Sequence, residues 1–138
     1  MELCDGNLSK LLLEKKVLNE KEIYEIMKQL NNAFKIMKEN KIIHRDLKLE
    51  NILIKNNEDK TFTLKLSDYG WSKKVMSFSR DFSNSNVGTN IYMAPEILKG
   101  DRHNYKCDLW SIGVIIYKLF FGKAPFLGLT ALKNNIEK

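Results

Sequence analysis

The clearest pattern in the chain is a segment near its start in which apolar side chains recur every three or four residues. Its apolar positions are Ile23, Ile26, Met27, Leu30, Ala33, Phe34 and Met37. This spacing places them on one face of a helix, so we expect an amphipathic helix that lines the core. Asn19 and Glu22 are spaced as in a capping box, with asparagine replacing the usual serine or threonine, and predict where the helix begins. Leucines at positions 8, 11, 12 and 13 predict a shorter helix before it.

Two short apolar runs come next, at residues 52–54 and 62–66, and a polar turn rich in asparagine and aspartate separates them. This arrangement predicts a β-hairpin. Residues 71–90 are polar and serine-rich without a period, and a loop of that length in a compact domain is usually functional or disordered. Residues 108–121 are apolar on nearly all sides, which predicts a buried helix that Gly122 and Pro125 would end.

The composition is that of an ordinary globular domain, with 43% hydrophobic and 29% charged residues among 138. It argues against a disordered or fibrous chain. No apolar run approaches the roughly 20 residues that a membrane-spanning helix needs, and no basic-then-apolar leader is visible, so we expect no membrane partner. Cys4 and Cys107 lack the spacing of metal ligands, which indicates reduced thiols in an intracellular protein. The cytoplasm is the expected compartment, with the nucleus as an alternative.

The net charge of +6 is compatible with binding to nucleic acid. The positive residues, however, are mostly lysines scattered along the chain, and arginine occurs only at positions 45, 80 and 102. Scattered lysines are typical of a solvated surface, so no nucleic-acid partner is expected. A basic nucleic-acid-binding protein is kept as a rival that would show salt-sensitive retention on DNA.

Three short motifs carry the chemistry of the chain. Residues 44–51, His-Arg-Asp-Leu-Lys-Leu-Glu-Asn, match the pattern H-R-D-L-x-x-x-N. Residues 68–70, Asp-Tyr-Gly, follow the predicted hairpin where the same motif set has D-F-G, and residues 94–96 match A-P-E. Three motifs in this order and spacing are a specific signal. Over nearly its whole length the chain resembles a eukaryotic protein kinase of the serine/threonine type.

The resemblance implies an α+β, mainly helical fold: the large C-terminal lobe of a kinase, with a small β-hairpin at the catalytic site. Residues 1–18 would form the hinge and first helix, 44–51 the catalytic loop, 68–96 the activation segment and 108–121 the buried helix. No glycine-rich loop or strand lysine precedes the motifs, and the final helices of the family are not seen. Residues 1–138 are therefore expected to be a partial kinase domain.

The resemblance also implies transfer of the γ-phosphate of ATP, with Mg²⁺, to a serine or threonine of a protein substrate. Asp46 would orient or accept the proton of the substrate hydroxyl. Asn51 and Asp68 would hold the magnesium ions, which prefer oxygen ligands. Lys48 would steady the transferring phosphate, and the Thr89 hydroxyl would contact Asp46 and Lys48. Lys48 and Thr89 together favour serine or threonine over tyrosine as the acceptor.

Other positions would bind the nucleotide or support the site. Backbone groups near Glu2 and Cys4 would hold the adenine of ATP, with Leu53 forming the floor beneath it. His44 would be structural and pack beneath the turn at residues 68–70. Tyr69 keeps the ring of the usual phenylalanine and adds a hydroxyl that needs a partner.

Regulation is expected through a phosphate on the activation segment. Ser85 stands at the usual phosphorylation position, and Arg45 with Lys73 would supply charge-assisted hydrogen bonds to it. The serines at positions 77, 79 and 83 are competing sites, and a plain flexible loop is the alternative. An activating kinase or regulatory subunit would then be a partner.

The expected substrate preference is weak. Glu50 matches a position that binds a basic substrate residue in some relatives, but Lys118 stands where those relatives often carry a second carboxylate. A positive charge there would repel arginine. The fragment alone is expected to be inactive or weak, and the alternative to a kinase is a truncated, non-catalytic protein-binding module.

Overall fold

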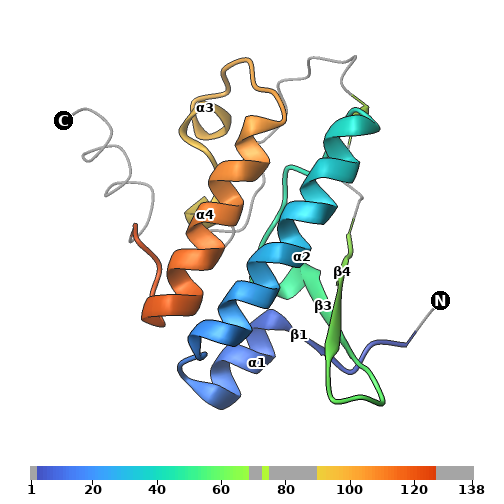
Figure 1. Cartoon of the computed structure of the whole chain (residues 1–138). Coiled ribbons are helices and arrows are strands. Elements are labelled where there is room, and N and C mark those ends of the chain that lie inside the picture. Colours follow the sequence, from blue (N-terminus) through green and yellow to red (C-terminus); the bar gives the residue numbers. More distant parts are fainter. Residues whose placement is uncertain (1–2, 69–72, 75–89, 127–138) are drawn as a thin grey trace.

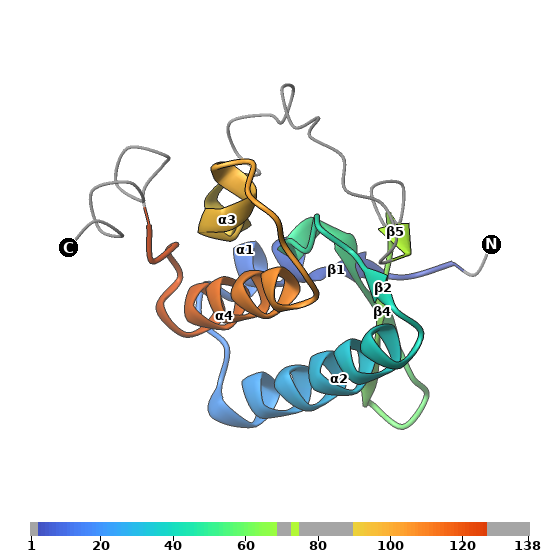
Figure 2. The same cartoon turned by 90° about the horizontal axis from the view of Figure 1, so that it is seen from above.

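The computed structural model describes residues 3–68, 73–74 and 90–126, and Lys73 and Lys74 by their backbone alone. Two long helices lie side by side and run in opposite directions, α2 over Glu20–Glu39 and α4 over Lys106–Phe121 (Figure 1). The shorter helices α1 and α3 span Leu8–Lys15 and Pro95–Leu98. Seen from above, α4 lies between α2 and α3 (Figure 2).

Helix α2 begins as the sequence predicts. The Asn19 side chain accepts a hydrogen bond from the backbone N–H of Glu22 at 2.9 Å, and the Glu22 carboxylate accepts one from the backbone N–H of Asn19 at 3.0 Å. This capping box satisfies two backbone donors that the helix itself cannot. The predicted apolar face is buried at Ile23, Ile26, Leu30 and Met37. Met27 was expected on this face, but it lies at its margin and is 40% exposed.

The predicted hairpin is confirmed, and it belongs to a three-stranded sheet. Strands β3 (Ile52–Asn56) and β4 (Phe62–Leu66) are antiparallel and pair Ile54 with Leu64. The two-residue strand β1 (Gly6–Asn7) joins the other edge of β3. A separate pair of two-residue strands, β2 (Ile42–Ile43) and β5 (Lys73–Lys74), is also antiparallel.

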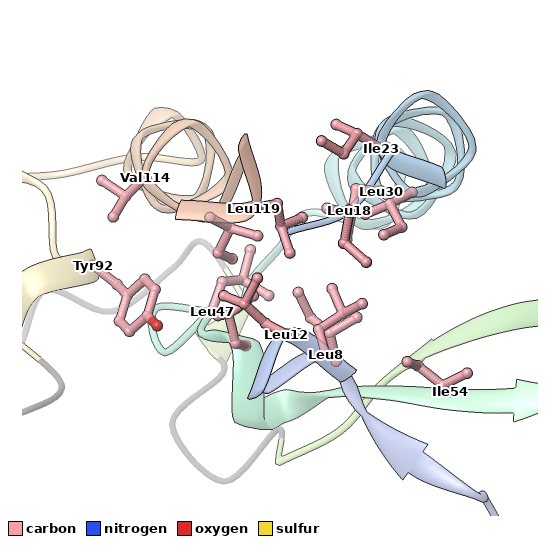
Figure 3. Packing of buried hydrophobic residues seen from close by; sticks show 14 of the residues in the cluster. Leu8, Leu12, Leu18, Ile23, Leu30, Leu47, Ile54, Tyr92, Val114 and Leu119 are labelled. Atoms are coloured by element: carbon pink, nitrogen blue, oxygen red, sulfur yellow. The ribbon is translucent and has the colours of Figure 1, made fainter. Parts of the chain in front are cut away.

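The main core lies where α1, α2, α4 and the hairpin meet (Figure 3). Leu8 of α1 and Leu119 of α4 are fully buried, and Leu47, from the loop before the hairpin, belongs to the same cluster. Two 3₁₀ turns contribute as well, η1 over Leu49–Asn51 and η3 over Asn90–Tyr92. The loop that carries the sequence motif is therefore anchored by leucines on a packed core.

Helix α4 differs from its prediction in two ways. It begins at Lys106, two residues earlier than the apolar run. Its last residue is Phe121, as predicted, and Gly122 after it has a φ of 69°, the left-handed conformation common after helices. It is buried on one side only, because Leu109, Phe120 and Phe121 are 46%, 43% and 62% exposed. Among the described residues, no helix combines the length and apolar character needed to cross a membrane.

One side chain of α2 extends the hairpin. Gln29 Nε2 donates to the carbonyl of Phe62 at 3.0 Å, and Gln29 Oε1 accepts from the backbone N–H of Leu64 at 2.8 Å. The amide thus occupies the edge of β4 as a neighbouring strand would. It also fixes the position of the hairpin relative to α2.

We predict that Gln29→Ala lowers the free energy of unfolding of this chain by about 1–2 kcal/mol, because two half-buried backbone groups lose their partner. Urea unfolding followed by circular dichroism measures this change. Lys35→Ala, at an exposed position of the same helix, is the control and should change stability by less than about 0.5 kcal/mol. If both substitutions changed the free energy of unfolding equally, the hydrogen bonds of Gln29 to the hairpin would not be stabilising as we predict.

A second prediction concerns acid stability. Partial burial of Glu22 opposes its ionisation. The net effect is nevertheless a lowered pKa of Glu22, because its carboxylate accepts hydrogen bonds from Lys15 and from the Asn19 backbone and lies near the positive charge of Lys15. A carboxyl group whose pKa is lower in the folded than in the unfolded chain stabilises the fold at any pH above the unfolded pKa, which is about 4.3. This stabilisation is lost as the pH falls through the pKa of the folded state.

Glu22→Gln should therefore destabilise the chain at pH 7 and have a smaller effect near pH 3. Thermal unfolding at both pH values measures this, with Glu58→Gln in the exposed hairpin turn as the control. A Glu22→Gln effect that does not vary with pH would contradict the prediction.

Candidate active site

The loop at residues 44–51 is held in place by a buried carboxylate of α4. Asp108 Oδ2 accepts a hydrogen bond from the backbone N–H of His44 at 2.8 Å, and Oδ1 accepts one from the backbone N–H of Arg45 at 2.9 Å. Asp108 is 1% exposed, and this burial raises its pKa, an effect that the two hydrogen bonds oppose. One side chain therefore fixes two consecutive residues of the loop.

The buried His44 ring joins the loop to the end of the hairpin. His44 Nε2 lies 2.9 Å from the carbonyl oxygen of Ser67, and Nδ1 accepts from the backbone N–H of Asp46 at 3.3 Å. Because Nδ1 accepts, the proton of a neutral imidazole is on Nε2. The backbone N–H of Ser67 donates in turn to the carbonyl of Asn51 at 2.9 Å. Both ends of the loop are thus tied to Ser67, the residue just before Asp68.

Asp46 lies at the centre of these contacts, and its two carboxylate oxygens have different surroundings. Lys48 Nζ lies 3.2 Å from Oδ2, and Asn51 Nδ2 donates to the same oxygen at 3.2 Å and to the Asp46 carbonyl at 2.9 Å. Oδ1 is shielded from solvent and has no hydrogen-bond partner within the described part of the chain. A buried carboxylate oxygen without a donor is unfavourable, so a hydrogen bond donated to Oδ1 would stabilise the site.

Two residues of this region adopt left-handed backbone conformations without being glycine. Arg45 has a φ of 69° and Asp68 a φ of 60°. Such conformations are uncommon for side-chain-bearing residues, and they persist where the surroundings determine them. At Arg45 the determining contact is the hydrogen bond to Asp108, which turns the chain so that Asp46 follows in its observed position.

The side chain of Asn51, which lies beside Asp46, carries an oxygen atom suited to a hard cation. Asn51 is 7% exposed and uses its amide N–H groups on Asp46, which leaves its oxygen for a different partner. The Asp68 carboxylate is exposed. No group of three or more histidine, cysteine, aspartate or glutamate side chains among the described residues could hold a metal by itself. The residues therefore fit Mg²⁺ bound together with phosphate and water oxygens, the usual arrangement for this ion.

The segment before α1 lies beside Leu53. Asn7 of β1 pairs with Leu53 of β3, and the backbone N–H of Asp5 donates to the carbonyl of Ile54 at 2.8 Å. Cys4 and Leu53 are both half-buried. These contacts place Asn7 beside Leu53 and Asp5 beside Ile54, while an adenine site between Cys4 and Leu53 stays a prediction.

Several residues predicted from the sequence are not brought to the site by the described structure. Glu2, Ser85 and Thr89 lie outside the described residues, as does Tyr69. Lys73 is described only as backbone, in β5, where it pairs with Ile43, two residues before Arg45. Arg45 Nε is buried and has no hydrogen-bond partner in the described ranges. The roles expected for these residues stay predictions.

Sequence reasoning missed two side chains that support the loop. In the sequence, Asp108 is only the first residue of an apolar run. A lone carboxylate in an otherwise apolar helix nevertheless indicates that this carboxylate has a buried hydrogen-bond partner. Ser111 Oγ donates to the carbonyl of Tyr92 at 2.7 Å and joins α4 to η3. A serine inside a buried helix has no comparable signal in the sequence.

Comparison with known proteins agrees with this geometry. The protein kinase domain family model matches residues 1–138. The chain is 41% identical over 133 residues to Serine/threonine-protein kinase 33 of Bos taurus and 42% identical over 139 residues to Calcium-dependent protein kinase 5 of Plasmodium falciparum. These matches cover 92% and 99% of the chain.

The same matches cover 27% and 23% of the two relatives, so the chain spans about a quarter of their length. The fold is accordingly the one expected, an α+β, mainly helical part of a kinase domain. The family model matches the chain over its full length, and the side chains of Asp46, Lys48 and Asn51 meet as the motif requires. Together with the sequence identity to serine/threonine kinases, this shows that the chain belongs to the serine/threonine protein kinase family.

Proposed function

We propose that the protein containing this chain transfers the γ-phosphate of ATP to serine or threonine hydroxyls of protein substrates. The observation that supports the proposal is the asymmetry of the Asp46 carboxylate. One of its oxygens is held by Lys48 and Asn51, while the other is buried and has no donor among the described residues. A substrate hydroxyl is a donor of the right kind for that oxygen.

In the proposed reaction, the substrate hydroxyl donates its hydrogen bond to Asp46 Oδ1 and passes its proton to this carboxylate. The hydroxyl oxygen forms a bond to the γ-phosphorus, the bond from that phosphorus to the bridging oxygen breaks, and ADP leaves with the electron pair. Mg²⁺, when bound at Asn51 and Asp68, neutralises charge on the phosphates. Lys48, which lies 3.2 Å from Asp46 Oδ2, supplies a fixed positive charge beside the transferring group.

Preference for serine and threonine is supported by Lys48 and by the names of the relatives, all of which are protein kinases and several of which are described as serine/threonine kinases. We also propose that adenine binds between the segment near Cys4 and Leu53. A phosphate on Ser85 would be bound by Arg45 and Lys73. The buried Arg45 Nε, for which the described part of the chain offers no hydrogen-bond partner, supports this.

The test is phosphate transfer by the full protein expressed from its complete transcript. We predict that Asp46→Asn lowers kcat for a serine peptide by about a hundredfold to ten-thousandfold, because the asparagine cannot accept the proton. Incorporation of labelled γ-phosphate into matched serine, threonine and tyrosine peptides measures the change. Asp59→Asn in the exposed hairpin turn is the control and should leave the rate unchanged.

Two results would overturn the proposal. The first is full activity in the Asp46→Asn variant. The second is the absence of ATP-dependent transfer by the wild-type protein, which would favour the non-catalytic binding module.

A further inference from the structure

A hollow between α1 and the three-stranded sheet lies outside the site described above. Helix α1 lies beside β1 and β3 (Figure 1), and the hollow has a volume of about 100 Å³. The residues that line it belong to segments 5–14 and 54–56, outside the loop at 44–51. Ile54 lines the hollow, and successive side chains of a strand point to opposite faces of a sheet. The hollow is therefore on the face opposite to Leu53, away from the proposed adenine site.

The floor of the hollow is apolar. Leu11 of α1 and Ile54 of β3 line it, and Ile54 is 7% exposed and belongs to the main core, against which Leu11 packs. Binding sites for small molecules have volumes of roughly 300–1,000 Å³, well above that of this hollow. The space therefore suits a single side chain of a bound protein rather than a nucleotide or another cofactor.

The rim of the hollow carries more negative than positive groups. Asp5, Glu14 and Lys10 line it, so two carboxylates stand against one ammonium group. Lys10 Nζ lies 4.0 Å from the nearest Glu14 oxygen, and the two side chains are 66% and 62% exposed. A pair this long and this exposed is weak, so Lys10 neutralises Glu14 only loosely. The rim thus favours a positively charged group.

A glycine leaves the hollow open. Gly6 lines it from β1, where the strand is paired with Ile54, and its φ is not positive, so its conformation does not require glycine. A Cβ atom at this position would lie 3.8 Å from Lys10 Cδ, which is an ordinary contact distance. A larger side chain at position 6 would therefore be tolerated by the backbone but would take up space in the hollow.

Part of the polar rim also has a structural role. Asp5 Oδ2 accepts a hydrogen bond from the backbone N–H of Asn56 at 2.8 Å, which extends the pairing of β1 with β3. A carboxylate has about four acceptor positions on its two oxygens, so this bond does not prevent Asp5 from accepting another donor. The weak pair with Lys10 likewise leaves Glu14 able to pair with a stronger cation. Structural roles thus do not compete with binding of a cation here.

We propose that the hollow binds an arginine side chain of a partner protein. The aliphatic part of the arginine packs on Leu11 and Ile54, and the guanidinium group pairs with Asp5 and Glu14. Arginine combines these two parts in one side chain, and its planar guanidinium is less strongly hydrated than an ammonium group, which favours pairing with carboxylates at a half-buried site. The inference concerns a docking site and does not depend on the proposed function.

The test uses three seven-residue alanine peptides with blocked ends and a central arginine, citrulline or norleucine. Citrulline keeps the shape of arginine without its charge, and norleucine keeps only the apolar stem. Each peptide is titrated into the full protein, and the methyl NMR signals of Leu11 and Ile54 are followed. The arginine peptide should shift these signals and bind about three- to tenfold more tightly than the citrulline peptide. Raising the salt concentration should reduce this ratio.

Variants of the rim should change the binding of the arginine peptide in opposite directions. Glu14→Gln and Asp5→Asn should weaken it, and the asparagine oxygen can still accept from the Asn56 backbone. Lys10→Met should strengthen it, because the competing positive charge is removed. Glu39→Gln, an identical loss of charge at the exposed end of α2, is the matched control and should bind as the wild type does.

A fourth variant tests the hollow itself. Gly6→Leu should abolish binding of the arginine peptide, because the new side chain fills the space above Leu11. Thermal unfolding checks that this variant keeps its fold. If it does not, comparison of Glu14→Gln with Lys10→Met gives the same decision.

Equal binding of the arginine and citrulline peptides would overturn the inference, and so would tighter binding of the norleucine peptide, which would indicate an apolar occupant. The absence of shifts at Leu11 and Ile54 with all three peptides would overturn it as well. None of the peptides contains a hydroxyl group, so these results are independent of phosphate transfer, whose failure would count against the proposed function alone.

Discussion

The bidentate hydrogen bond from the loop backbone to Asp108 is the contact on which the rest of the site depends. It places His44 and Arg45 relative to α4, and it holds Arg45 in a left-handed conformation that a residue with a side chain seldom adopts. Asp46 then lies where Lys48 and Asn51 can reach one of its oxygens. A carboxylate buried at this depth is unfavourable unless it is fully hydrogen-bonded, so the helix and the loop stabilise each other only in this arrangement.

The elements predicted correctly are those with a local signal. The capping box at Asn19 and Glu22 depends on residues three apart, and the hairpin depends on two adjacent runs and the turn between them. The two-residue strands were not predicted, because such strands are too short to show a period. Lys73 and Lys74 have the polarity of a surface segment, and they pair with residues about thirty positions earlier.

The site shows the same division between local and distant contacts. Asp46, Lys48 and Asn51 were identified because they belong to one eight-residue motif, and the structure brings their side chains together. The contribution of Asp108 could not be derived from that motif, since it acts across 64 positions of the chain. The contact between Lys118 and Tyr92 spans 26 positions, and neither residue type signals it. Long-range polar contacts of this kind depend on how helices pack, which no local pattern specifies.

The amide of Gln29 has a consequence for how this protein behaves at high concentration. Strand β4 is at one edge of the three-stranded sheet, and a free edge presents backbone groups that can recruit a strand from another molecule. Gln29 already occupies the carbonyl of Phe62 and the N–H of Leu64. A single polar side chain from the neighbouring helix thus protects the hairpin against intermolecular β-pairing, where many proteins use a charged residue, a proline or a bulge.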